Sequence, residues 1–296
     1  MNDAFSTFHP IVNFTWFAAV LIFSMFLMHP VFLTISLVSG FCYSIVLNGR
    51  KSLRFNLLHL LPLLLFMALL NPSFNHAGNT ILFYLPSGNP ITLESILYGV
   101  SAAAMFVSVI LWFSCYNTIM SSDKFIYLFG RILPSFSLIF SMVLRFVPRY
   151  KAQIKAISNA QKCIGRDISS GTIIQRVKNG IRILSIMTTW ALESAVETAD
   201  SMKSRGYGLP GRTSFSIYRF DGRDGTALTS ILILTVFVLS GTFSGQTTMR
   251  FFPSVKIPET TSFSFILYAA YLGLCLIPVI IDAWEEFKWN SIRSKT

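Results

Sequence analysis

Charged residues are scarce in this sequence. Only 12% of its 296 residues are Asp, Glu, Lys or Arg, about half of the roughly 25% that is typical of soluble domains. Hydrophobic residues make up 53% of the chain. This composition excludes a soluble enzyme, a disordered chain and a secreted disulfide scaffold. It predicts an all-α, polytopic membrane protein, because each membrane-spanning helix needs about 20 mainly apolar residues.

Signatures of catalysis and of metal binding are also missing. The chain has no P-loop, no HExxH, no GxSxG and no paired Cys/His spacing, so we expect no cofactor, no metal site and no catalytic residue. Its four cysteines lack CxxC spacing, and three fall in or beside apolar segments, which favours buried free thiols. Of the four scattered histidines only His59 falls within an apolar run, where it has either a functional or a local structural role.

Six apolar runs are predicted to span the membrane, and a seventh is shorter. The seventh, Ile132–Val147, is interrupted by Pro134 and is either an interfacial helix or a partial span. Small residues four apart within the runs favour close helix packing, inside this chain or against another membrane subunit. The six runs are Ile11–Met28, Val31–Leu47, Phe55–Leu70, Ser95–Cys115, Ala227–Phe243 and Phe263–Ile281.

Basic residues predict the orientation. The chain has 24 Lys and Arg against 13 Asp and Glu. If the N-terminus is cytoplasmic, 22 of the 24 basic residues lie inside and only Arg250 and Lys256 lie outside, as the positive-inside rule requires. Both termini are therefore predicted to be cytoplasmic in a multi-pass cell-membrane protein. Because cytoplasmic loops account for the basic excess, no nucleic-acid partner is predicted.

The segment Arg145–Gly225 has a different composition, with 14 basic and six acidic residues. No part of it could span a bilayer without carrying charge, so it is predicted to be a cytoplasmic insertion. The expected organisation is N-terminal transmembrane helices in 1–147, a cytoplasmic domain in 148–225, and C-terminal transmembrane helices with a basic tail in 226–296.

Two amphipathic helices are predicted within this insertion. The first runs from Pro148, which suits a first helical turn, to Ile164. The second begins after Thr172, which with Gln175 fits a capping box, and ends at Gly206. Along the second helix, apolar residues recur mostly in steps of three and four, with a gap at Thr188, a pattern that is typical of a helix–helix seam: Ile174, Val177, Ile181, Leu184, Ala191, Ala195 and Met202.

Each predicted helix ends with an arginine beside a glycine. The two sequences are Gly165-Arg166-Asp167 and Ser204-Arg205-Gly206. An arginine presents a planar fork of five donors whose charge is permanent, which suits bidentate capture of a carboxylate on a partner. The alternative is that Arg205 only complements the dipole of its own helix. The repetition of the pattern brings the two interpretations close to parity.

The stretch from Ala199 to Gly208, followed by Gly211-Arg212-Thr213, resembles the second coupling motif of energy-coupling-factor (ECF) transporter T components, a family that includes the cobalt-transport permeases. The first coupling helix of that family is similar to Leu144–Pro148 leading to Gln161–Asp167, and an external loop of some members is similar to Asn71–His76 with Phe83–Leu85.

This resemblance implies a membrane scaffold for a vitamin or metal-ion importer that joins a small substrate-binding S component to two cytoplasmic ATPases. It implies that two coupling helices cross beneath the membrane and that each helix end sits in a groove of one ATPase. The implied ATPase-coupling residues are Gly165, Arg166, Asp167, Ser204, Arg205 and Gly206. At the first helix end, glycine replaces the alanine that the family has before the arginine.

Two other classes of transporter remain as alternatives. A secondary transporter should show inverted repeats and polar groups at mid-membrane, and His59 is the single candidate for such a group. A conventional ATP-driven permease that binds substrate itself would normally show one coupling helix per subunit, not two ending in arginine. The sequence leaves the imported substrate open.

Overall fold

The first two long helices of the protein each begin at a His-Pro pair. In the computed structural model, α1 (Pro10–Phe26) and α2 (Pro30–Asn48) each begin with proline, and the Nδ1 atom of the preceding histidine accepts the amide of the second helical residue at 3.3 Å. Proline suits this position because the first amides of a helix have no partner within it. The structure describes residues 4–84, 88–130, 134–207, 209, 218–256, 258 and 260–293, without the side chains of 134–137 and 290.

The third span combines three helical segments. They are α3 (Arg50–Phe55), a π-helical turn η2 (Asn56–Leu60) and α4 (Leu61–Phe74). His59 lies in the π-helical turn, where its exposed ring stacks on Phe55 with the centroids 4.9 Å apart.

Helix α5 (Leu93–Ile119) packs against α1, α2 and α4, and the core of this part of the protein is aromatic. Trp16 and Trp112 are fully buried and meet edge to face at 5.5 Å. The Trp16 indole donates to the carbonyl of Leu274 at 2.8 Å, which joins α1 to α10 (Ser262–Arg293), and the Trp112 indole donates to Ser36 in α2 at 2.9 Å. Together these contacts hold four helices around one centre.

The small residues serve packing within the chain. A Cβ added to Gly40 would lie 3.3 Å from the Trp112 ring, and one added to Gly99 would lie 2.8 Å from the carbonyl oxygen of Ala68. Helix α9 (Gly222–Phe243) approaches α10 closely in the same way at Gly241. The packing interpretation is therefore confirmed at Gly40 and Gly99.

All six predicted runs form helices. Five of them are long and apolar enough to cross a membrane, and the sixth, α1, has 17 residues. The four cysteines form no disulfide with one another. Cys115 and Cys275 are buried, as predicted, whereas the predicted burial of Cys42 is wrong and Cys163 is also exposed. A short hairpin between α4 and α5 was not predicted: β1 (Ile81–Tyr84) pairs antiparallel with β2 (Pro90–Thr92).

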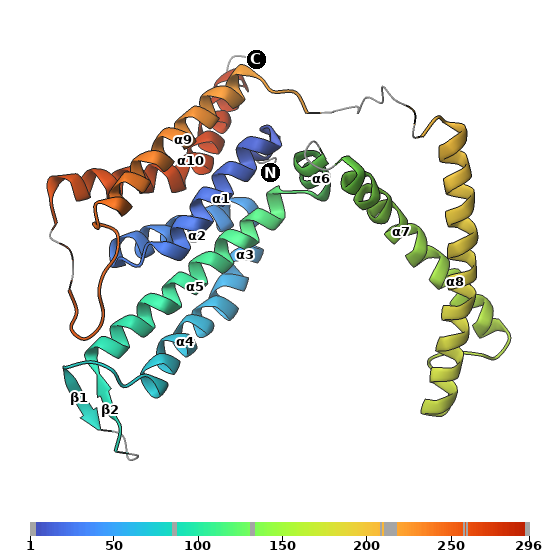
Figure 1. Cartoon of the computed structure of the whole chain (residues 1–296), viewed down its shortest axis with the longest axis horizontal. Coiled ribbons are helices and arrows are strands. Elements are labelled where there is room, and N and C mark those ends of the chain that lie inside the picture. Colours follow the sequence, from blue (N-terminus) through green and yellow to red (C-terminus); the bar gives the residue numbers. More distant parts are fainter. Residues whose placement is uncertain are drawn as a thin grey trace. The chain divides into compact units, whose positions relative to one another are not determined.

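The chain divides into two compact units. The first comprises Met1–Phe125 and Tyr218–Thr296, and the second comprises Ile126–Ile217. The short helix α6 (Ser122–Gly130) contains the boundary. The second unit holds α7 (Pro134–Cys163) and α8 (Ile173–Ser204), which cross each other (Figure 1).

Two predictions for the second unit are wrong. Helix α7 starts at Pro134 and not at Pro148, which lies inside it; the flanking residues continue the helix although proline supplies no amide hydrogen. The predicted seam of α8 does not face α7, because Ile174, Ile181 and Leu184 are all more than 60% exposed. The buried contact uses another face of α8, where Ile183 and Met187 pack against Ile157 of α7.

Candidate functional site

The end of α7 closes as a Schellman motif, a helix end built around a left-handed residue. Gly165 has a φ of 76°, and its amide donates to the carbonyl of Lys162 at 3.0 Å. The amide of Arg166 then donates to the carbonyl of Gln161 at 2.9 Å. The backbone of Arg166 is thus held by α7 while its side chain is exposed.

The end of α8 repeats this geometry. Gly206 has a φ of 81° and donates to the carbonyl of Lys203 at 3.0 Å, and Tyr207 donates to that of Met202, also at 3.0 Å. Arg205 is the C-cap residue and is exposed. The predicted helix end at Gly206 is therefore confirmed.

The two arginines occupy different positions in the same motif. Arg166 follows the left-handed glycine, whereas Arg205 precedes it. The structure also does not bring the arginines together: Arg166 lies beside the first turns of α8, and Arg205 lies at its other end. The 32 residues of α8 separate them by about 48 Å at a rise of about 1.5 Å per residue.

Asp167 belongs to the turn that follows Arg166. Its carboxylate accepts the hydroxyl of Ser169 at 2.6 Å and the amide of the same residue at 3.1 Å, and it pairs with Lys162 at 3.5 Å. The hydrogen bonds from Ser169, aided by Lys162, lower the pKa of Asp167 to about 2. The described ion pair of Asp167 is therefore internal to this turn and is made with Lys162.

The start of α8 braces this turn from the other side. The Arg176 side chain donates to the carbonyl of Ile168 at 2.7 Å, and the Asn179 amide donates to that of Asp167 at 3.0 Å. The predicted capping box between Thr172 and Gln175 is confirmed. Only the capping box had a sequence signal, since the other two bonds depend on how the turn folds back.

A polar hollow of about 330 Å³ lies beside Arg166. Its walls include two exposed cationic side chains, Arg166 and Lys178, together with the amides of Gln175 and Asn179 and three residues of the turn, Gly165, Ser170 and Gly171. Since both charged groups in the lining are positive, the hollow suits a carboxylate supplied by another molecule.

Separate contacts in the first unit hold the segments through which the chain leaves it and returns. Buried Lys124, in α6, donates to the carbonyl of Ser6 at 2.6 Å. At the start of α9, Arg223 pairs with Glu285 at 3.0 Å and also donates to Thr7 at 3.1 Å. Both segments are thereby fastened to the same N-terminal turn, η1 (Phe5–Thr7).

Two aspartates also accept hydrogen bonds from backbone amides near the N-terminus. The Asp282 carboxylate accepts the amides of Ala4 and Phe5 at 2.9 and 3.3 Å, and buried Asp224 accepts the amide of His9 at 3.0 Å. The sequence pattern did not reveal these contacts, because each partner lies more than 200 residues away.

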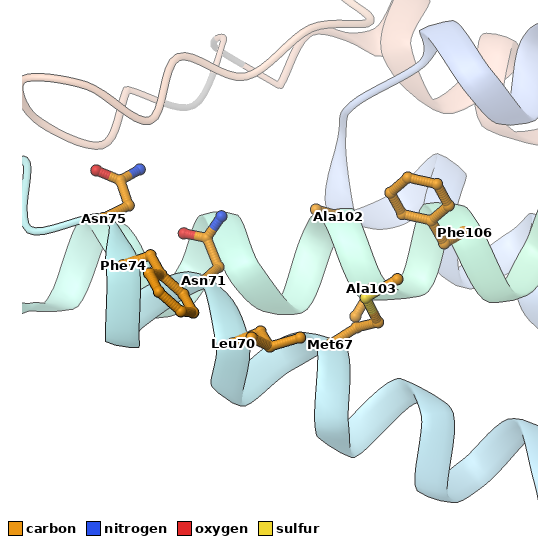
Figure 2. Close-up of a pocket in the computed structure, with 8 residues that line it drawn as sticks. All are labelled: Met67, Leu70, Asn71, Phe74, Asn75, Ala102, Ala103 and Phe106. Carbon is orange, nitrogen blue, oxygen red and sulfur yellow. The ribbon is translucent and has the colours of Figure 1, made fainter.

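A second hollow, of about 290 Å³, lies between α4 and α5 (Figure 2). Its lining is mainly apolar, and Asn71 and Asn75 supply its polar side chains. Among the described residues no side chain bonds the buried Oδ1 atom of Asn71. Within the described part of the chain, no three His, Cys, Asp or Glu side chains converge as a metal site would require.

The fold and these helix ends define a class: a polytopic α-helical membrane protein with two amphipathic helices in a separate unit. Comparison with known proteins gives the family. Residues 4–215 match the CbiQ cobalt transport protein family, and the chain belongs to this family.

Curated relatives agree with this assignment. The chain is 30% identical over 214 residues to the energy-coupling factor transporter transmembrane protein EcfT of Streptococcus thermophilus (strain ATCC BAA-250 / LMG 18311), covering 68% of this chain and 81% of that protein. It is 34% identical over 103 residues to EcfT of Lactococcus lactis subsp. cremoris (strain MG1363), covering 34% of this chain and 39% of that protein. EcfT of Bacillus subtilis (strain 168) is 33% identical over 99 residues, covering 33% and 37%. The chain thus spans less than half the length of several relatives that it matches.

Proposed function

We propose that this chain is the transmembrane coupling subunit of an ATP-driven ECF-type importer of a vitamin or metal ion. In this role it is not an enzyme; two partner ATPases hydrolyse ATP, and a small S component in the bilayer binds the substrate. The observation that carries the proposal is the pair of arginine-bearing Schellman ends in a member of this family.

The helix ends fit docking into ATPase grooves. Each glycine turns the chain away from its helix, which leaves the neighbouring arginine exposed. The coupling residues are Gly165, Arg166 and Asp167 at one end and Ser204, Arg205 and Gly206 at the other. In this proposal residues 148–225 form the coupling domain between the N-terminal and C-terminal transmembrane regions.

The exposed apolar face of α8 fits a membrane partner. Ile174, Val177, Ile181 and Leu184 lie on one side of the helix and are all more than 55% exposed. A contiguous exposed apolar surface marks an interaction site more often than a solvated face. We assign this face to the S component and the facing lipid.

Reconstitution tests the proposal. The purified chain should hydrolyse no ATP, whereas co-expression with its ATPases should yield a complex that does. Vesicles that also hold the S component should take up its ligand when ATP is supplied. Turnover by the chain alone, after contaminants have been removed, or failure of any ATPase to co-purify would contradict the assignment.

Orientation is tested separately. We propose a bacterial or archaeal cell-membrane location with both termini cytoplasmic, which places α7 and α8 on the cytoplasmic side. A cysteine at Asn79 should react with an impermeant reagent added outside, and one at Ser169 should react only after permeabilisation. The reverse pattern would overturn this topology.

A further inference from the structure

The hairpin between α4 and α5 presents an apolar surface. All four residues of β1, Ile81-Leu82-Phe83-Tyr84, are exposed, by 46 to 64%. The hairpin extends beyond the ends of α4 and α5 (Figure 1). A two-stranded hairpin is at best marginally stable alone in water, so another surface that covers these side chains would stabilise it.

The base of the hairpin is firmly fixed. The Glu94 carboxylate is buried and accepts both the amide and the hydroxyl of Thr80, at 3.2 and 2.8 Å. Thr92, also buried, donates to the carbonyl of Ala77 at 2.7 Å. Gly78 has a φ of 137°, and a Cβ there would lie 2.6 Å from the Glu94 carboxylate. The apolar strand therefore extends from a base that buried hydrogen bonds hold in place.

The segment of the sequence that carries this strand lacks charged residues. No Asp, Glu, Lys or Arg occurs in the sequence between Arg54 and Glu94. The carboxylate of Glu94 is occupied by its hydrogen bonds with Thr80 at the base of the hairpin. The exposed cations of the neighbouring loop are Arg250 and Lys256, whose backbones form an antiparallel bridge. This loop lies at the same end of the unit as the hairpin, because the ring of Phe251 packs against that of Tyr98, near the start of α5, with the ring centroids 5.3 Å apart.

We propose that the hairpin is an interfacial anchor whose β1 side chains insert into the lipid leaflet at this end of the spans. The exposed side chains of α4 are also apolar, and Arg250 and Lys256, which lie at the same end of the unit, suit lipid phosphates. The hairpin cannot insert deeply, because the backbone groups at the unpaired edges of its strands would find no hydrogen-bond partners in the hydrocarbon. Aromatic side chains such as Phe83 and Tyr84 favour the headgroup boundary, where the backbone can still meet water.

A fluorescent label at Phe83→Cys tests this contact in the full chain, held in nanodiscs without partners. The background carries Cys42→Ser and Cys163→Ser, which removes the two exposed thiols. We expect blue-shifted emission, quenching by nitroxide lipids and protection from aqueous iodide. Phe66→Cys on the exposed side of α4 is the lipid control, and Ser170→Cys in the α7–α8 turn is the water control. Tyr84→Cys repeats the measurement if Phe83→Cys does not fold.

The same label shows whether lipid, water or a partner protein surrounds the β1 side chains. Iodide quenching equal to that at Ser170, without quenching by nitroxide lipids, would overturn the proposal. Protection that appears only when the S component is added would assign the strand to that partner instead. With the label at Tyr84→Cys, Phe83→Asp should restore iodide access, whereas Ser244→Asp, exposed at the end of α9, should not. The measurement needs no ATPase, so its result is independent of the proposed coupling function.

Discussion

The ends of α7 and α8 share one backbone motif but differ in what surrounds it. The turn after α7 is tied back to α8 by Arg176 and Asn179 and is closed internally by Asp167. At the end of α8, the amides of Gly206 and Tyr207 close the helix, and the amide of Leu209 donates to the carbonyl of Gly206 at 3.2 Å. The comparison indicates that side chains of α8 help to hold the turn that presents Arg166, whereas Arg205 is itself the C-cap residue of α8.

This difference predicts different responses to the same charge reversal. Arg205→Glu should release the ATPases, because stranding one partner of a desolvated charge pair costs about 2–5 kcal/mol. That loss is roughly a 30-fold or greater weakening of binding. Arg166→Glu should weaken binding less, since Lys178 keeps a positive charge at the hollow. Pull-down of the ATPases with quantified expression measures both.

Lys203→Glu is the matched control for that comparison. It reverses a charge on the last turn of the same helix, where a dipole effect alone is worth about 0.3–1 kcal/mol. If Arg205→Glu and Lys203→Glu weaken ATPase binding equally, Arg205 is only a helix terminus.

The glycines test the shared motif. Gly206→Ala and Gly165→Ala each force a side chain into the left-handed region, which costs roughly 1–2 kcal/mol. We expect slightly more at Gly206, where the new Cβ would lie 3.2 Å from Leu209, than at Gly165, which faces open space. Amide hydrogen exchange across the last turn of each helix measures the loss; unchanged protection in both variants would contradict the motif.

Loss of the hydrogen bond from Asn179 should loosen the turn after α7 and leave the end of α8 unchanged. Asn179→Ala breaks the bond to the Asp167 carbonyl, and a hydrogen bond contributes about 0.5–1.5 kcal/mol. A spin label on Cys163, in a Cys42→Ser background, should gain mobility, while exchange at the end of α8 stays constant. Lys178→Ala, which removes an exposed side chain without a described hydrogen bond, is the control. Equal mobility in the two variants would mean that Asn179 does not hold the turn.

The smallest effect concerns pH. The pKa of Asp167 is lowered to about 2, below the ordinary aspartate value of about 3.9. Its contribution to the turn is therefore complete above about pH 4 and is lost as the pH falls through about 2. The Cys163 label should gain mobility in that window, and Asp167→Asn should abolish this step. A step that persists in Asp167→Asn would belong to another group.

Local signals allowed much of the architecture to be predicted from the sequence. Apolar runs located the spans, and the Thr172–Gln175 spacing and Gly206 located both ends of α8. The packing face of α8 could not be chosen, because apolar residues occur both on the predicted seam and around Ile183 and Met187. Periodicity identifies apolar faces, but it does not identify which face another helix covers.

Long-range pairing limited the prediction elsewhere. The bond from Lys124 to Ser6 joins residues 118 apart in the chain, and sequence spacing carries no trace of it. Both arginine-bearing helix ends were found, because glycine beside arginine is a local pattern. Their ATPase contact stays a prediction.

Photo-cross-linking from the helix ends tests the coupling role most directly. A photoreactive residue at Tyr207, beside Arg205, and another at Ile168, beside Arg166 and Asp167, should each form a covalent adduct with an ATPase subunit in the assembled complex. The same residue at Phe66, on the exposed side of α4, should form none. If neither helix end cross-links to an ATPase in a complex that still hydrolyses ATP, the coupling role assigned to Arg166 and Arg205 is wrong.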